Sequence, residues 1–199
     1  MARILLINPS KWGRGITPIW IASHAATLKE KSHSVELFDA TFYRDWTNRE
    51  VDYNTDNAQY RPTEYSNYVE FREENVVKKL QEKITHFQPD IIFWSAISSH
   101  IHGEGEYVNI QYGYELLNSV KSDALRITAG LQPTALGERI FDIFPNVDIF
   151  IRGESEFVLL DIVENICEKD TIRKIKGIVF KDDSGKIVET LKQDIISNL

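Results

Sequence analysis

The chain has 199 residues, 42% of them apolar and 27% charged, a composition typical of one globular α/β domain. Its net charge of −7 argues against a general nucleic-acid binder, because neutralising phosphates requires clustered Lys and Arg side chains. The single cysteine, Cys167, excludes an intrachain disulfide and any metal or iron–sulfur site built from several cysteines.

The start of the chain carries no targeting pattern. An apolar run over 3–7 follows the first two residues directly, without the apolar segment and cleavage site of a signal peptide. No apolar run approaches the roughly 20 residues that a membrane span requires. We therefore expect a cytoplasmic protein with neither a membrane nor a nucleic acid as its partner.

Short apolar runs alternate with segments of helical periodicity along the chain. The expected strands cover 3–7, 35–39, 91–95, 125–128 and 147–151. The expected helices cover 18–31, 69–87, 107–122, 134–144 and 157–168. Continuous apolar strands are typical of parallel sheets covered on both faces, so the pattern predicts a doubly wound, five-stranded parallel sheet, flavodoxin-like or Rossmann-like. Cys167 falls in the last helix, where we expect a buried, unreactive side chain.

A hairpin is expected near the end of the chain, with strands over 178–180 and 186–189 around the turn at 182–185. No linker divides residues 3–170, so the one candidate boundary follows Asp170. The sequence predicts an α/β domain over 1–170 and a C-terminal hairpin or linker segment over 171–199.

The segment 43–68 interrupts this alternation with a long, polar, tyrosine-rich stretch. Loops of this length are typical of functional lids or partner surfaces. An ordered excursion that covers the protein's own sheet is an equally good interpretation. The partner-surface reading belongs to a second hypothesis, in which the chain is a non-enzymatic interaction or signalling module.

The stretch 127–134 is the centre of the predicted site, because an apolar strand runs into a small turn and then into a helix. Gly130 in that turn permits positive φ or a close approach to a ligand. Thr134 is a candidate helix cap, and Pro133 stiffens the approach. Ligands of open parallel sheets bind beyond the carboxyl ends of the strands, at the topological switch point. We therefore expect this turn to form part of a ligand crevice.

Several motifs with defined chemistry are missing from the crevice loops. Gly13-Arg14-Gly15 lacks the third glycine of a dinucleotide fingerprint, and there is neither a P-loop lysine motif nor a G-x-S-x-G elbow. His100, His102 and Glu104 could ligate a metal if the loop were extended, which gives a third hypothesis, a metal-dependent enzyme. The remaining histidines, His24, His33 and His86, are predicted to lie at the surface, and Glu156 is predicted to favour a helix start rather than to act in catalysis.

The predicted rim of the crevice is small and neutral. Its polar or small residues are Asn8, Ser10, Ser95, Ala96, Ser98, Gly130, Gln132, Thr134 and Gly153, with apolar walls from Trp12, Ile97 and Leu131. Such a rim suits a large, mostly neutral ligand held by backbone groups and hydroxyls.

Five short motifs carry a family resemblance. They are Ile-Asn-Pro at 7–9, Gly-Leu-Gln-Pro-Thr at 130–134, Arg-Gly-Glu-Ser-Glu at 152–156, Lys-Gly-Ile-Val-Phe at 176–180 and Asp-Ser-Gly-Lys-Ile-Val at 183–188. In this order they resemble the cobalamin-binding domain of cobalamin-dependent radical S-adenosylmethionine enzymes and the segment that leads to the radical domain.

The resemblance implies a flavodoxin-like sheet that holds cobalamin over the strand ends, with its nucleotide tail in the crevice. Ser95-Ala96-Ile97 corresponds to the Ser-x-Leu of cobalamin domains, and Ala129-Gly130 to their Gly-Gly. The candidate cofactor-binding residues are Asn8, Pro9, Trp12, Gly13, Ser95, Ile97, Ser98, Gly130, Gln132, Pro133, Thr134, Gly153 and Glu154.

Two departures limit what the resemblance implies. The loop 8–15 contains no histidine, so we expect cobalamin without a lower axial histidine, and Trp12 or Arg14 could occupy that face. The chain also lacks C-x-x-x-C-x-x-C and holds no iron–sulfur cluster. We expect this chain to be non-catalytic alone and to serve a radical domain, in cis or in trans, of a methyltransferase.

Overall fold

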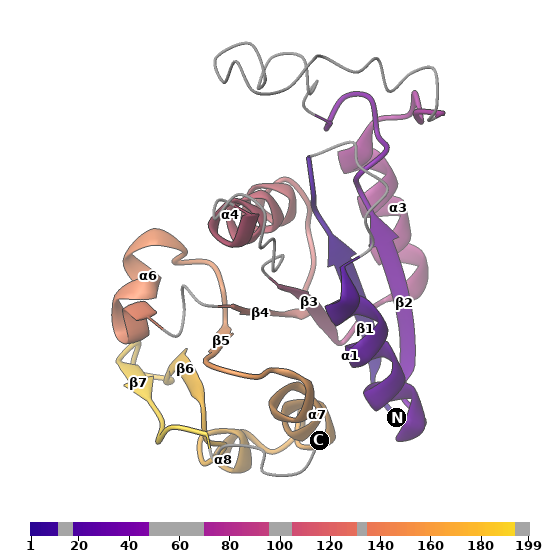
Figure 1. Ribbon diagram of the computed structural model, residues 1–199. Coiled ribbons are helices and arrows are strands. Elements are labelled where there is room, and N and C mark those ends of the chain that lie inside the picture. Colours follow the sequence, from indigo (N-terminus) through magenta and orange to yellow (C-terminus); the bar gives the residue numbers. More distant parts are fainter. Residues whose placement is uncertain (12–17, 48–69, 96–104, 131–134, 194–199) are drawn as a thin grey trace.

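The computed structural model describes residues 1–11, 18–47, 70–95, 105–130 and 135–193, and it contains one seven-stranded sheet in the order β2-β1-β3-β4-β5-β6-β7 (Figure 1). Five strands are parallel, and their order is that of a flavodoxin-like sheet. They are β1 (Arg3–Asn8), β2 (Ser34–Asp39), β3 (Ile91–Ser95), β4 (Leu125–Ala129) and β5 (Ile149–Ile151). The predicted fold class is confirmed.

Helices cover both faces of the sheet because the inner strands are apolar on both sides. Alternate residues of β3 belong to two separate cores: Phe93 to one and Trp94 to the other. One face carries α1 (Ile19–Glu30), α7 (Glu156–Glu164) and α8 (Lys169–Ile172). The other carries α3 (Val76–Phe87), α4 (Gly105–Asn118), the 3-10 turn η2 (Gly137–Arg139) and α6 (Ile140–Ile143).

The contact between α4 and β3 is unusually close. A Cβ atom added to Gly113 would meet the buried ring of Trp94, whose indole N–H donates to the carbonyl oxygen of Ile110 at 3.0 Å. Glycine therefore lets α4 approach the end of β3 directly, and this brings the first turns of α4 next to the carboxyl end of that strand.

Several helix boundaries differ from the sequence prediction, and two of them have a clear physical reason or consequence. α3 begins after Asn75, not at residue 69, because the Asn75 side chain accepts a hydrogen bond from the backbone N–H of Lys78 at 2.9 Å and so caps the helix. α7 ends at Glu164, so Cys167 lies beyond the helix and is exposed. The prediction of a buried cysteine was wrong because it extended the apolar helix face by one turn too many.

The C-terminal hairpin is confirmed, and it extends the same sheet. β6 (Ile178–Lys181) pairs antiparallel with β5, and β7 (Ile187–Glu189) pairs antiparallel with β6. Asp182 shapes the turn, because its carboxylate accepts hydrogen bonds from the backbone N–H groups of Ser184 and Lys186. The division into domains at residue 170 stays a prediction. Among the described residues, no helix is long and apolar enough to cross a membrane.

Candidate functional site

The carboxyl ends of β1, β3, β4 and β5 meet at one edge of the sheet, which we call the carboxyl edge. In the sheet, β2 lies on one side of β1 and β3 lies on the other side. The direction of chain progression therefore reverses between β1 and β3, which is the topological switch point. Asn8 and Ser95 flank this point, each two residues beyond the last pair of that ladder, Leu6 and Phe93. Both side chains are buried.

Asn8 is fixed by a hydrogen-bond network at the end of β1. Its side-chain nitrogen donates to a carboxylate oxygen of Asp39 and to the hydroxyl of Thr41, both at 3.1 Å. A carboxylate oxygen only accepts, so the amide nitrogen must face Asp39. The amide oxygen of Asn8 is then left buried without a hydrogen bond from any described residue.

Asn109, in the first turns of α4, repeats this arrangement beside β3. Its side-chain nitrogen donates to the carbonyl oxygen of Ser95 at 2.6 Å, and this contact again fixes the orientation of the amide. Asn109 is 2% exposed, and its amide oxygen has no partner among the described residues. Sequence reasoning missed this residue, because nothing in a helical pattern marks an inward-facing polar position as a site.

The end of β4 contributes backbone rather than side chains. Gly130 has φ of 145°, a conformation that favours glycine, so the expectation of positive φ is confirmed. The hydroxyl of Ser95 donates to the carbonyl oxygen of Ala129 at 3.3 Å and ties β3 to β4 at the edge. Thr128 is fully buried, and its hydroxyl oxygen lacks a partner within the described part of the chain.

The turn after β5 is attached to the C-terminal hairpin. Arg152 forms an ion pair with Glu189 of β7, and its backbone N–H donates a hydrogen bond to the carbonyl oxygen of Gly177 at 2.7 Å. Gly153 has φ of 85°, and Glu154 next to it is exposed. On the other side of the edge, the carbonyl oxygen of Pro9 accepts the indole N–H of Trp46 at 2.9 Å.

The structure thus brings Asn8, Pro9, Ser95, Gly130 and the turn at 153–154 to one edge of the sheet, as predicted. Their contact with a cofactor stays a prediction. The other candidate residues lie outside the described ranges: Trp12, Gly13, Ile97, Ser98, Gln132, Pro133 and Thr134. The hypothetical metal ligands His100, His102 and Glu104 and most of the tyrosine-rich segment also lie outside these ranges. Within the described ranges, no group of three metal-ligating side chains occurs.

His24 is a correction to the sequence analysis, which placed it at the surface. It is 1% exposed, and its ring stacks on Phe93 at a centroid distance of 4.8 Å. Its Nδ1 donates to the carbonyl oxygen of Trp20 at 2.7 Å, and Nε2 lies 2.9 Å from the hydroxyl of Ser155. The weak periodicity of α1 hid this inward position, and only the packing of α7 against α1 defines it.

The environment of His24 favours the neutral ring. Burial lowers its pKa below the usual value for histidine, although the bond to Trp20 and the charge of Glu156 act in the opposite direction. Ser155 precedes α7 at the capping position but does not cap the helix, because its hydroxyl pairs with His24 instead. Ser23 donates to the carboxylate of Glu156 at 3.1 Å. Two consecutive residues of α1 therefore hold the turn after β5.

Lys11 provides a fixed cation near the end of β1. Its ammonium group lies 4.1 Å from the ring centre of Trp46 and 4.6 Å from that of Tyr112. Glu115 pairs with the same ammonium group at 3.1 Å. Glu115 therefore compensates the charge of Lys11, whereas the carboxylate of Asp39 lies beside Asn8 at the end of β1.

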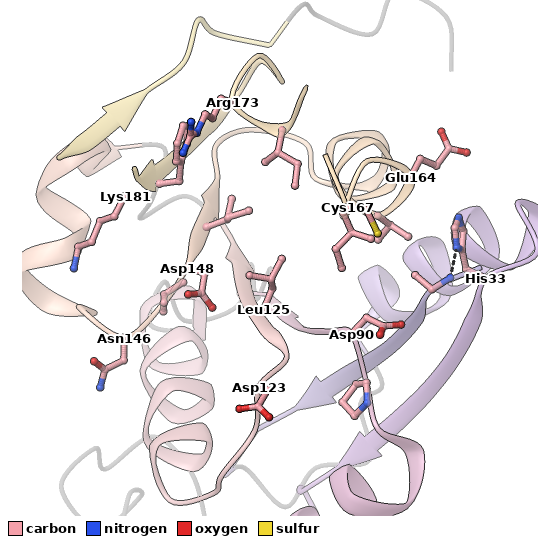
Figure 2. Close-up of a pocket in the computed structure, with 18 of the residues that line it drawn as sticks. His33, Asp90, Asp123, Leu125, Asn146, Asp148, Glu164, Cys167, Arg173 and Lys181 are labelled. Carbon is pink, nitrogen blue, oxygen red and sulfur yellow. Dashed lines mark hydrogen bonds between the residues drawn. The ribbon is translucent and has the colours of Figure 1, made fainter. Parts of the chain in front are cut away.

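A broad groove of about 1420 Å³ lies at the opposite edge, where the parallel strands begin. Figure 2 shows Asp90, Asp123 and Asp148 around Leu125 in this groove. Asp90 accepts the backbone N–H of Arg3 at 2.7 Å, and Asp148 accepts that of Arg126 at 2.7 Å. These carboxylates secure the first residues of neighbouring strands, so we assign them a structural role despite the size of the groove.

Comparisons with known proteins show what the chain is similar to in sequence. No family model matches the chain. An anaerobic magnesium-protoporphyrin IX monomethyl ester cyclase from Cereibacter sphaeroides is 32% identical over 118 residues, which cover 57% of this chain and 18% of that protein. The protein of the same name from Rubrivivax gelatinosus is 23% identical, over 99% of this chain and 31% of its own length. The chain therefore spans less than a third of these relatives.

Solved structures share the fold over almost the whole chain. The radical S-adenosylmethionine methyltransferase TsrM from Kitasatospora setae, with cobalamin and a [4Fe-4S] cluster bound, matches with a TM-score of 0.63 and 17% identity over 100% of this chain and 30% of its own. The cobalamin-dependent S-adenosylmethionine radical enzyme OxsB, with aqua-cobalamin bound, matches with a TM-score of 0.59 and 16% identity over 98% of this chain and 23% of its own. The resemblance expected from the sequence is confirmed at the level of the fold.

Proposed function

We propose that this chain binds cobalamin at the carboxyl edge and serves a radical S-adenosylmethionine enzyme that transfers methyl groups. The observation that carries the proposal is a switch point lined by buried, neutral polar side chains. Two of them, Asn8 and Asn109, have amide oxygens without a hydrogen bond from any described residue. Cobalamin is large, and its corrin ring carries peripheral amides that can donate to such oxygens. Its presence in solved structures with the same fold supports the assignment.

The described residues fit this cofactor in three ways. Asn8 and Asn109 would accept hydrogen bonds from ligand amides. Gly130 leaves the turn after β4 free of side-chain bulk. Ser95 ties β3 to β4 beside the switch point and keeps the rim rigid. When bound, cobalamin supplies a cobalt centre that carries a methyl group, while the chain binds, orients and shields it.

The axial ligand and the partner follow from the same proposal. We infer that the loop 8–15 supplies no lower axial histidine to cobalt, because it contains none, and that His24 is not the ligand, because it is held by Trp20 and Ser155. The radical domain, in cis or in trans, would supply the iron–sulfur cluster. The substrate and the methyl acceptor belong to that domain.

Reconstitution tests the proposal directly. The purified chain is incubated with hydroxocobalamin and passed over a gel-filtration column, and the corrinoid absorbance is measured in the protein peak. We expect equimolar corrinoid with the absorption spectrum of a form that lacks an axial nitrogen ligand from below. Elution of all corrinoid in the small-molecule volume would contradict cobalamin binding. A histidine-ligated spectrum would contradict only the axial assignment.

A further inference from the structure

We propose that Asn8 and Asn109 make the carboxyl edge selective for the uncharged primary amides of the corrin periphery over carboxylates. This inference rests on the proposed function and concerns which chemical groups of a corrinoid the site accepts. It begins from the direction in which the two side chains are held.

Both amides are oriented by partners that can only accept hydrogen bonds. A carboxylate oxygen of Asp39 takes the amide nitrogen of Asn8, and the carbonyl oxygen of Ser95 takes that of Asn109. A flip of either side chain would place two acceptors against each other. The group left for a ligand is therefore an oxygen in both cases, and each oxygen is buried without a hydrogen bond from the described residues.

A buried oxygen acceptor without a partner favours a ligand group that donates a hydrogen bond to it over a group that only accepts hydrogen bonds. The NH₂ of a primary amide satisfies this requirement. A carboxylate offers only acceptors, so each oxygen would remain unpaired and would face another oxygen. Sites built around such polar groups reject analogues that cannot complete the hydrogen bond.

The charges near Asn8 act in the same direction. Asp39 carries a carboxylate within 3.1 Å of the Asn8 amide nitrogen, so a ligand carboxylate at Asn8 would meet a second negative charge nearby. The nearby cation, Lys11, is already paired with Glu115 at 3.1 Å and lies against Trp46 and Tyr112. It therefore offers little compensation to an anionic ligand.

The test compares cobalamin with its monocarboxylic acids, in which one peripheral amide is hydrolysed, by equilibrium dialysis against the unmodified chain at neutral pH. We expect at least one acid isomer to bind about tenfold more weakly, or worse, because it loses a donor and adds a charge. Equal affinity of cobalamin and every acid isomer would overturn the inference and leave the proposed function standing. No binding of cobalamin itself would overturn both.

A variant locates the selectivity. Asn109→Ala removes the unpaired oxygen, so the ratio of acid to cobalamin dissociation constants should fall towards one for the isomer that Asn109 excludes. Asn118→Ala, on the exposed last turn of α4, is the matched control and should keep the ratio. A ratio unchanged in both Asn109→Ala and Asn8→Ala would overturn the assignment. Because the ratio compares two ligands on one protein, a general loss of stability does not mimic the effect.

Discussion

The two edges of the sheet differ in how their polar groups are used. At the amino edge, where the parallel strands begin, the carboxylates of Asp90 and Asp148 each accept the backbone N–H of a residue in a neighbouring strand. At the carboxyl edge, Asn8 and Asn109 are neutral and buried, and each retains an oxygen without a partner among the described residues.

Under the proposed function, this difference separates polar groups that stabilise the fold from polar groups that bind a ligand. A polar group whose hydrogen bonds are complete stabilises the fold, whereas a buried group with an incomplete set lowers stability until a ligand completes it. The large groove therefore lies at the edge where bonding is already satisfied.

The largest effect should follow from filling the carboxyl edge. We expect Gly130→Trp to weaken cobalamin binding by about 100-fold, equivalent to about 2.7 kcal/mol, because the indole occupies space beside the switch point. Gly130→Ala shares the backbone strain without the bulk and should retain most of the affinity. Asp123→Trp places the same indole at the amino edge and should leave the dissociation constant unchanged. Equal losses in the two tryptophan variants would remove the distinction between the edges.

The second effect concerns the support behind the carboxyl edge. His24→Gln should lower the free energy of unfolding by about 1–3 kcal/mol, because it leaves buried groups of Trp20 and Ser155 without their partner. Urea denaturation at neutral pH measures the change. His86→Gln, on the exposed side of α3, is the control and should have little effect.

The same variant tests the pH dependence. The pKa of His24 is lowered in the folded state, so below about pH 6.5 the unfolded chain binds a proton that the folded chain does not. Stability should therefore fall as the pH decreases from 6.5, and His24→Gln should reduce that slope. Burial also lowers the pKa of His33, so His33→Gln measures the contribution of His33 to the pH dependence of stability. An unaltered slope in His24→Gln would show that His24 is not held neutral.

A smaller effect is expected at the amino edge. Asp90→Ala removes the acceptor for the backbone N–H of Arg3 and should cost about 1 kcal/mol of stability. The cobalamin dissociation constant should not change, since the proposed cobalamin site lies at the other edge of the sheet. Equilibrium dialysis beside urea denaturation separates the two quantities, and weaker binding in the folded variant would contradict the structural role of this edge.

The smallest effect has the opposite sign. Burial raises the pKa of Asp148 more than the Arg126 N–H lowers it, so ionisation above that pKa costs stability. Asp148→Asn keeps an acceptor and should increase the free energy of unfolding at pH 7 by about 0.5 kcal/mol or less, because solvent still reaches the side chain and screens its charge despite the surrounding residues. The gain should vanish below about pH 3.8, where aspartate is protonated in both states. A loss at pH 7 would indicate that the charged hydrogen bond dominates.

Much of the fold could be predicted because its signals are local. The run Ile91–Ser95 and the turn at Gly130 carry their structure in a few residues. Helix ends were less accurate: the capping side chain of Asn75 outweighed the periodicity that continued before it.

The site could be predicted only in part, because its decisive contacts join distant segments. Asn8 was identified from its position after a strand, but its unpaired oxygen depends on Asp39 and Thr41. Asn109 and His24 were missed or misplaced because each is defined by a partner far along the chain, Ser95 or Ser155. The spacing of apolar residues along the sequence does not indicate hydrogen bonds between such distant residues.

The packing of Gly113 against Trp94 has a consequence for optical measurement. The indole is enclosed, and its N–H is fixed to Ile110, one residue from Asn109. A ring held in one asymmetric setting contributes to near-ultraviolet circular dichroism, whereas a mobile ring does not. Trp94 is therefore an intrinsic spectroscopic probe beside the candidate site. Its signal reports, without an attached label, whether α4 remains packed against β3.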